Sequence, residues 1–406
     1  MNELDALWAF LVALVVALAA TPLAARFARR VGAIDEPHAR GLHDEPTPSL
    51  GGLAILAGVL LAGALFLPLT GSPLDPNVFS GQQTRGILAG AAAIAMVGAI
   101  DDRAPEGLRP FVKLLGQFGA ALIPVLSDVR VENVTLPFID PVELGNWSIP
   151  LTLVGLVAVM NVVNFTDGVD GLAAGVCTIA AGTFAVIALS LDRVDAGILA
   201  ALTAGAAVGF LWHNFHPASI FMGDSGSNLL GLLLGCVAIQ GVLKTAAVVA
   251  LFFPLVILAV PIVDSTFVMM KRIKYRRPVW DADQYHFHHR FQRIGFSQRR
   301  TALYLYAWTL SLAALALALR FVPYSDDNGH FDTGWTLVVI AFGLVAFAAS
   351  IYLVLVLEIL KFSRFRERQL RKQAVADGAT PLSDSDIEAE IEREVETGEF
   401  EIIRPD

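Results

Sequence analysis

Long apolar stretches recur along the whole 406-residue chain and constrain its fold more than any other feature. A helix of about 20 apolar residues crosses the roughly 30 Å hydrocarbon core of a bilayer. Charged residues make up only 17% of the sequence, against about 25% in soluble domains. We therefore predict an all-α polytopic integral membrane protein with about eleven transmembrane helices. Its apolar runs are 6–25, 50–69, 85–100, 110–127, 148–163, 171–191, 196–212, 225–241, 245–270, 301–322 and 334–360.

The distribution of basic residues predicts how these helices are oriented. Lysine and arginine accumulate on the cytoplasmic side of membrane proteins. Suppose that the first apolar run begins outside the cell and that successive runs cross the membrane in alternating directions. The segments on the cytoplasmic side then carry 22 basic residues, and the segments on the outer side carry five. We therefore expect a multi-pass protein of the inner (plasma) membrane, with its N-terminus outside and its C-terminus in the cytoplasm. The first run is not expected to be a cleaved signal peptide, because Glu3 and Asp5 precede it.

The chain divides into a transmembrane domain, 1–362, and a charged cytoplasmic tail, 363–406. Residues 377–406 contain eleven acidic residues, so the net charge of −9 belongs to the tail. The tail is either disordered or contains a short amphipathic helix. Between residues 128 and 147 an alternating pattern predicts a small outward β-hairpin.

Five polar clusters interrupt the apolar pattern, and the alternation of helices places all five on the cytoplasmic side. Ionised carboxylates at the edge of a membrane are costly to keep, so they are functional candidates. We therefore expect an active site built from cytoplasmic loops. The clusters are GLHDEPTPSLGG (41–52), AIDDR (99–103), NVVNFTDGVDGLAAG (161–175), NFHPASIFMGDSGSNLLG (214–231) and DADQYHFHHR (281–290).

Acidic residues in three clusters are candidates for binding a divalent cation. Asp101 and Asp102 are adjacent, so they repel each other unless a cation or a proton relieves them. Asp167 and Asp170 are interleaved with glycines, so both carboxylates can face one volume. Asp224 begins an apolar run, where nearby serines and amides cap the helix or hold an anion. Each has a structural alternative as a turn or cap, but together they are typical of Mg²⁺ ligands.

Three histidines lie within four positions of the most basic loop: His286, His288 and His289. Zinc is the alternative for such a tract, but no cysteine or further histidine has zinc-finger spacing. Arginines such as Arg290 in the same loop favour a phosphate ligand instead. Carboxylates for Mg²⁺ beside phosphate donors are suited to phosphoryl transfer, here to a lipid phosphate.

The motifs N-x-x-N-x-x-D-G-x-D-G-L and F-M-G-D-x-G-S together resemble the polyprenyl-phosphate N-acetylhexosamine-1-phosphate transferases, glycosyltransferase family 4. The resemblance covers about 26–300 and the two closing runs. His-x-His-His-Arg at 286–290 is similar to the branch that starts O-antigen and teichoic-acid synthesis, rather than to the phospho-N-acetylmuramoyl-pentapeptide transferases. The resemblance implies transfer of a sugar 1-phosphate, first of all GlcNAc-1-phosphate, from a UDP-sugar to undecaprenyl phosphate with release of UMP. It also implies Mg²⁺, or Mn²⁺ in its place. No nucleic-acid partner is expected, and a homodimer is expected only by this analogy.

The resemblance also implies a role for each matching residue. Asp101 matches the family's proposed base, and Asp102 matches its neighbour near the lipid phosphate. Asp224 matches the metal ligand, with Asp167 as a second candidate ligand. The matching catalytic residues are Asp101, Asp102, Asp167, Asp170 and His286. The matching substrate-binding residues are His43, Asn164, Asn214, Phe221, Asp283, His288, His289 and Arg290.

Two positions depart from the family pattern, and both lack a positive charge. Gly41 stands where the family usually has lysine, and Gln284 stands where the sugar-initiating branch usually has arginine. These losses leave the identity of the donor open, including a muramoyl-pentapeptide donor. An ion-coupled transporter is a further alternative, but transporters place their acids near the bilayer midplane. An inactive lipid-binding scaffold is a third, against which the intact aspartates argue.

Overall fold

The computed structural model describes residues 3–36, 46–71, 78–104, 107–134, 142–242, 297–323 and 332–351, with the single residues 262 and 370. Within these ranges the regular secondary structure is helical apart from two short β-ribbons. The all-α prediction is therefore confirmed for the described residues.

Ten α-helices lie in the described ranges, and each overlaps most of one predicted apolar run. The run 245–270 lies outside the described residues, apart from residue 262. Six of the described helices are long and apolar enough to cross a membrane, namely α1, α3, α5, α6, α7 and α12. The chain is thus a multi-span membrane protein, and the total of eleven spans stays a prediction. The helices are α1 (Glu3–Val31), α2 (Gly51–Phe66), α3 (Gly81–Arg103), α4 (Pro110–Leu126), α5 (Ser148–Thr166), α6 (Leu172–Ser190), α7 (Val194–Asn214), α8 (Gly223–Val237), α12 (Gln298–Phe321) and α13 (Thr333–Ile351).

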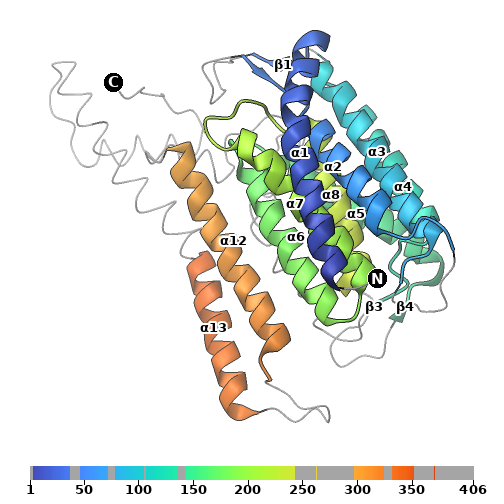
Figure 1. Cartoon of the computed structure of the whole chain (residues 1–406). Coiled ribbons are helices and arrows are strands. Elements are labelled where there is room, and N and C mark those ends of the chain that lie inside the picture. The colour runs from blue at the N-terminus through green and yellow to red at the C-terminus, as the bar shows by residue number, and fades with distance from the viewer. Residues whose placement is uncertain are drawn as a thin grey trace.

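Helices α1 to α8 form one bundle, and α12 and α13 stand along one side of it (Figure 1). Helix α7 lies inside the bundle, between α1 and α6. In its most apolar stretch 83% of the residues are buried, against 28% in α1. Helix α12 packs on α6, and α13 packs on α12. A π-helical turn, Ala238–Val242, continues α8, and a 3₁₀ turn, Gly145–Trp147, precedes α5.

Small side chains explain how closely the helices pack. In α1, Ala9, Ala13 and Ala17 are fully buried at a spacing of four residues. This face of α1 packs against α2 and α7. In a membrane, small residues on one helix face let neighbouring backbones approach and gain van der Waals contact.

Two antiparallel ribbons lie at opposite ends of the bundle (Figure 1). Strands β1 (Ile34–Asp35) and β2 (Thr47–Pro48) pair between α1 and α2. Strands β3 (Asn133–Val134) and β4 (Val142–Glu143) pair at the other end, between α4 and α5. The second ribbon confirms the predicted hairpin between residues 128 and 147.

The polar clusters that the structure describes lie at one end of the bundle. The C-terminal ends of α3, α5 and α7 meet the N-terminal ends of α6 and α8 there, next to the β1–β2 ribbon (Figure 1). This confirms that the described clusters share one side. The cluster 281–290 lies outside the described residues, and the membrane side of this end stays a prediction.

Candidate active site

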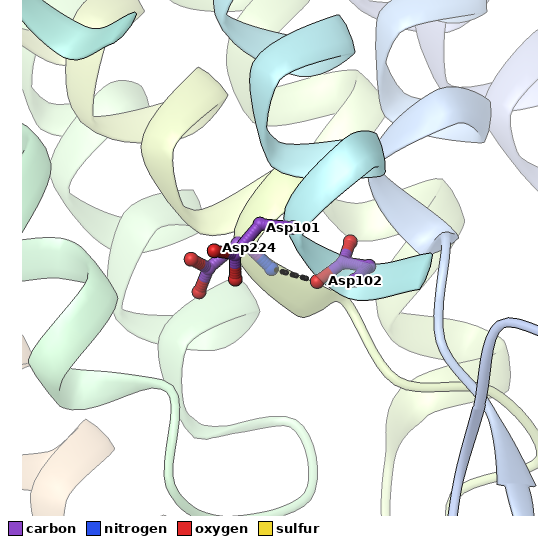
Figure 2. Close-up of side chains that lie close together, drawn as sticks. All are labelled: Asp101, Asp102 and Asp224. Atoms are coloured by element: carbon purple, nitrogen blue, oxygen red, sulfur yellow. Dashed lines mark hydrogen bonds between the residues drawn. The ribbon is translucent and has the colours of Figure 1, made fainter. Parts of the chain in front are cut away.

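Three carboxylates meet where the last turn of α3 approaches the first turn of α8. Asp101 and Asp102 come from α3, and Asp224 comes from α8 (Figure 2). One potential ligand atom from each lies within 4.8 Å of the others. Such an all-oxygen set suits a hard divalent cation, since Mg²⁺ prefers carboxylate oxygens and water.

Two glycines allow α3 and α8 to come this close. A Cβ atom on Gly98 would lie 2.3 Å from the backbone nitrogen of Ser225. Gly223 has a φ of +67°, and its Cβ atom would lie 2.4 Å from a carboxylate oxygen of Asp102. Any larger residue at either position would push the carboxylates apart.

Asp102 caps the N-terminus of α8. Its Oδ1 accepts a hydrogen bond from the Asp224 amide at 2.7 Å, drawn dashed in Figure 2. Its Oδ2 accepts one from the Ser225 amide at 3.1 Å. The serines expected to cap this helix instead donate to backbone carbonyls, Ser225 to Met222 and Ser227 to Gly223. The amides at the helix N-terminus are therefore bound by a carboxyl side chain of the protein itself.

Asp224 is held by residues from α4 and α5. The side-chain amide of Asn164 donates to Asp224 Oδ1 at 2.6 Å and to Ser227 Oγ at 2.9 Å. The ammonium of Lys113 forms an ion pair with Asp224 Oδ2 and donates to Asn164 Oδ1 at 3.3 Å. Lys113 is not among the site residues predicted from the sequence. In the sequence, Lys113 stands out only as a lone cation near the start of the apolar run 110–127.

A buried polar network supports these groups from below. Gln117 follows Lys113 by four positions, so both lie on one face of α4. Gln117 Nε2 donates to Asn228 Oδ1 at 2.8 Å, and Asn161 Nδ2 donates to Gln117 Oε1 at 2.9 Å. Asn228 Nδ2 in turn donates to the backbone oxygen of Asp224 at 2.8 Å. The network joins α4, α5 and α8 directly beneath the carboxylates.

Asp101 and Asp167 complete the acidic part of the site. Asp101 Oδ1 accepts a hydrogen bond from the Leu108 amide at 2.8 Å. Asp167 directly follows α5 and is not part of the three-carboxylate group. Burial raises the pKa of Asp167 to about 8, and the negative charges of Asp224, Asp102 and Asp170 contribute to this increase. Asp167 is therefore mostly protonated at neutral pH while no cation is bound.

Asp170 and Asn214 hold neighbouring loops. Asp170 Oδ2 lies 2.8 Å from His216 Nδ1 and accepts a hydrogen bond from the Ala218 amide at 3.1 Å. The buried Asn214 accepts from the Gly171 amide and donates to the Ile220 carbonyl, both at 3.0 Å. Both ends of its amide are thus engaged within the protein, and its contact with uracil stays a prediction.

All eight predicted site residues that the structure describes line one pocket of about 900 Å³. They are Asp101, Asp102, Asn164, Asp167, Asp170, Asn214, Phe221 and Asp224. Arg103, Ser49 and the acidic pair Asp35 and Glu36 also line it. The remaining predicted residues lie outside the described ranges: His43, Asp283, His286, His288, His289 and Arg290.

Comparison with known proteins points to one family. The model of glycosyl transferase family 4 matches residues 84–242, which contain every carboxylate of the three-residue group. A probable undecaprenyl-phosphate N-acetylglucosaminyl 1-phosphate transferase of Bacillus subtilis is 37% identical over 312 residues, covering 76% of this chain and 84% of the relative.

Two further relatives have names that describe two different transferase activities. A decaprenyl-phosphate N-acetylglucosaminephosphotransferase of Mycobacterium leprae is 35% identical over 320 residues, covering 73% of this chain and 79% of the relative. A phospho-N-acetylmuramoyl-pentapeptide-transferase of Desulforudis audaxviator is 35% identical over 335 residues, covering 76% and 95%. At this identity and coverage, with the motif residues gathered in one pocket, the chain belongs to glycosyl transferase family 4.

Proposed function

We propose that this protein transfers GlcNAc-1-phosphate from UDP-N-acetylglucosamine to undecaprenyl phosphate and releases UMP. The product would initiate a cell-envelope polysaccharide. The observation that carries this proposal is the group of Asp101, Asp102 and Asp224, which lies in a pocket at the ends of membrane-spanning helices. A polyprenyl phosphate is held at this depth by its own prenyl chain, so only the sugar donor has to come from water. The printed activities of the relatives from Bacillus subtilis and Mycobacterium leprae support the same reaction.

Mg²⁺ is the proposed cofactor, with Mn²⁺ as a substitute. Asp224 is the central ligand in this proposal, with Asp101 beside it and Asp167 as a further candidate. The group of Asp101, Asp102 and Asp224 supports it, since one oxygen from each carboxylate lies within 4.8 Å of the others. When bound, the cation would neutralise charge on the donor diphosphate.

The proposed nucleotide wall is formed by Asn164 and residues 167–170 with Asn214 and Phe221. All of these residues line the pocket. The ring of Phe221 offers an aromatic face to uracil. Loop carboxylates such as Asp170 can accept hydrogen bonds from N–H and O–H groups of the nucleotide.

Arg103 is proposed to receive the phosphate of the acceptor. Among the described residues lining the pocket, it is the one with a permanent positive charge. Its Nε donates to the carbonyl of Val31 at 3.2 Å, which anchors the guanidinium between the ends of α1 and α3. The remaining guanidinium nitrogens suit a phosphate, which arginine binds in a bidentate manner.

In the proposed reaction, an oxygen of the lipid phosphate attacks the phosphorus that carries the sugar. The bond between this phosphorus and the bridging oxygen breaks, and UMP leaves with that oxygen. A phosphate monoester has a second pKa of about 6, so the acceptor is mostly ionised at neutral pH. We therefore assign Asp101 the orientation of the acceptor rather than the removal of a proton.

A phospho-N-acetylmuramoyl-pentapeptide transferase activity is the second candidate, because a relative of that name is 35% identical over 95% of its own length. Purified protein with undecaprenyl phosphate, Mg²⁺ and a panel of UDP-sugars separates the two. We expect UMP release with UDP-N-acetylglucosamine. Preference for UDP-N-acetylmuramoyl-pentapeptide would support the second candidate, and no UMP release with any donor would contradict both.

A further inference from the structure

Two loops form the side of the pocket that faces α12. One, residues 167–171, joins α5 to α6, and the other, residues 215–222, joins α7 to α8. Asn214 links them, because its side chain accepts from the Gly171 amide and donates to the Ile220 carbonyl. The position of each loop therefore depends on the other.

The carboxylate of Asp170 is fixed by the second loop. Both of its contacts use one oxygen, Oδ2, which lies 2.8 Å from His216 Nδ1 and 3.1 Å from the Ala218 amide. Asp170 lines the pocket, whereas His216 and Ala218 do not. Across the described residues, Oδ1 has no such contact. The second loop thus holds the carboxylate from behind and leaves Oδ1 for a ligand.

Helix α12 anchors both loops from outside the bundle. Arg299 Nε donates to the backbone oxygen of His216 at 2.9 Å, and the Tyr306 hydroxyl donates to the backbone oxygen of Gly171 at 2.5 Å. The two residues are seven positions apart, or about two helical turns, so they share one face of α12. Gly175 makes room for the tyrosine, since a Cβ atom there would lie 2.1 Å from its ring.

We propose that His216 is a positioning residue, anchored on α12 by Arg299, that holds the carboxylate of Asp170 in the orientation needed to recognise the uridine nucleotide of the donor. Tyr306 anchors the loop of Asp170 in the same way. This inference rests on the proposed function. Neither His216, Arg299 nor Tyr306 lines the pocket, so each acts through the loops rather than on the substrate.

Steady-state kinetics of UMP release test the proposal. His216→Ala removes the hydrogen bond to the Asp170 carboxylate. Because a hydrogen bond to a charged group contributes substantially to binding, the KM for UDP-N-acetylglucosamine should rise about tenfold. The kcat and the KM for undecaprenyl phosphate should stay near the wild-type values. His216→Asn should restore most of the donor KM, because its amide nitrogen can take the place of Nδ1. Ser219→Ala is the matched control, since it removes a hydrogen bond of the same loop that does not involve Asp170.

Hydrogen exchange provides a second readout that is independent of turnover. In His216→Ala the amides of Ala218 and Gly171 should exchange faster than in the wild type, and in His216→Asn they should not. If the wild type and His216→Ala have the same KM for UDP-N-acetylglucosamine, the positioning role is contradicted. It is also contradicted if His216→Asn raises this KM as much as His216→Ala does. Absence of UMP release by the wild-type protein would instead contradict the proposed function, and unchanged amide exchange would then overturn the positioning role separately.

Discussion

At the scale of single residues, the aspartates of the site differ in their contacts and therefore in their roles. Asp102 accepts two backbone hydrogen bonds at the start of α8, so both of its oxygens are engaged within the fold. Asp224 is instead held by Asn164 and paired with Lys113 at the edge of the pocket. Asp101 and Asp102 are adjacent in the motif, but their contacts differ.

Substitutions of Asp224 and Asp102 should therefore separate activity from stability. Asp224→Asn should lower kcat by about 100-fold or more, because a lost metal ligand removes several kcal/mol of transition-state stabilisation. Asp102→Ala should also lower the free energy of unfolding by about 1 kcal/mol, as loss of a helix cap does. UMP release and thermal unfolding without added metal measure the two effects. Equal loss of thermal stability in both variants would contradict this assignment.

The raised pKa of Asp167 predicts a pH dependence of metal binding. The group is mostly protonated below its pKa of about 8, and a metal ligand has to be deprotonated. If Asp167 is a ligand, the apparent affinity for Mg²⁺ should rise as the pH increases from 6.5 to 8.5 and then level off. Titration calorimetry with wild type and Asp167→Asn measures this, and the variant should show a flatter profile. The same pH profile in both proteins would exclude Asp167 as a ligand.

At the scale of secondary-structure elements, the site depends on the close approach of α3 and α8. Gly98→Ala should abolish UMP release, because the added Cβ atom would overlap the backbone of Ser225. Gly119→Ala in α4 is the matched control, since nothing lies within 4 Å of its added Cβ atom. The control should keep wild-type activity. An active Gly98→Ala variant with unchanged metal dependence would show that this approach is not required.

The elements themselves were largely predictable, and the contacts between them were not. Apolar runs between polar clusters predicted the helices, because a membrane tolerates few other backbones. The same alternation predicted that the described clusters share one end. The cap formed by Asp102 could not be predicted, since it joins residues 122 positions apart. Lys113 could not be identified as a site residue from the sequence. A single lysine near the end of a span is equally expected from the accumulation of basic residues on the cytoplasmic side.

At the scale of the whole molecule, the orientation of the bundle remains to be tested. The buried Cys177 and Cys236 give a low background for thiol labelling. Cysteine in place of Glu143, in the exposed β4 strand, should react with a membrane-impermeant maleimide in intact cells. Cysteine in place of Arg109, exposed at the opposite end of the bundle, should react only after the membrane is opened. The reverse pattern would place the pocket outside the cytoplasm. The homodimer expected by analogy also stays a prediction.

The central claim is that the chain transfers a sugar together with its phosphate. UDP-N-acetylglucosamine labelled with ³²P at the sugar-linked phosphate tests this most directly, in the presence of undecaprenyl phosphate and Mg²⁺. We predict that the label moves into the lipid fraction, that the released nucleotide is unlabelled UMP, and that Asp224→Asn abolishes the transfer. Label that stays in released UDP would show transfer of the sugar alone and would contradict the proposed reaction.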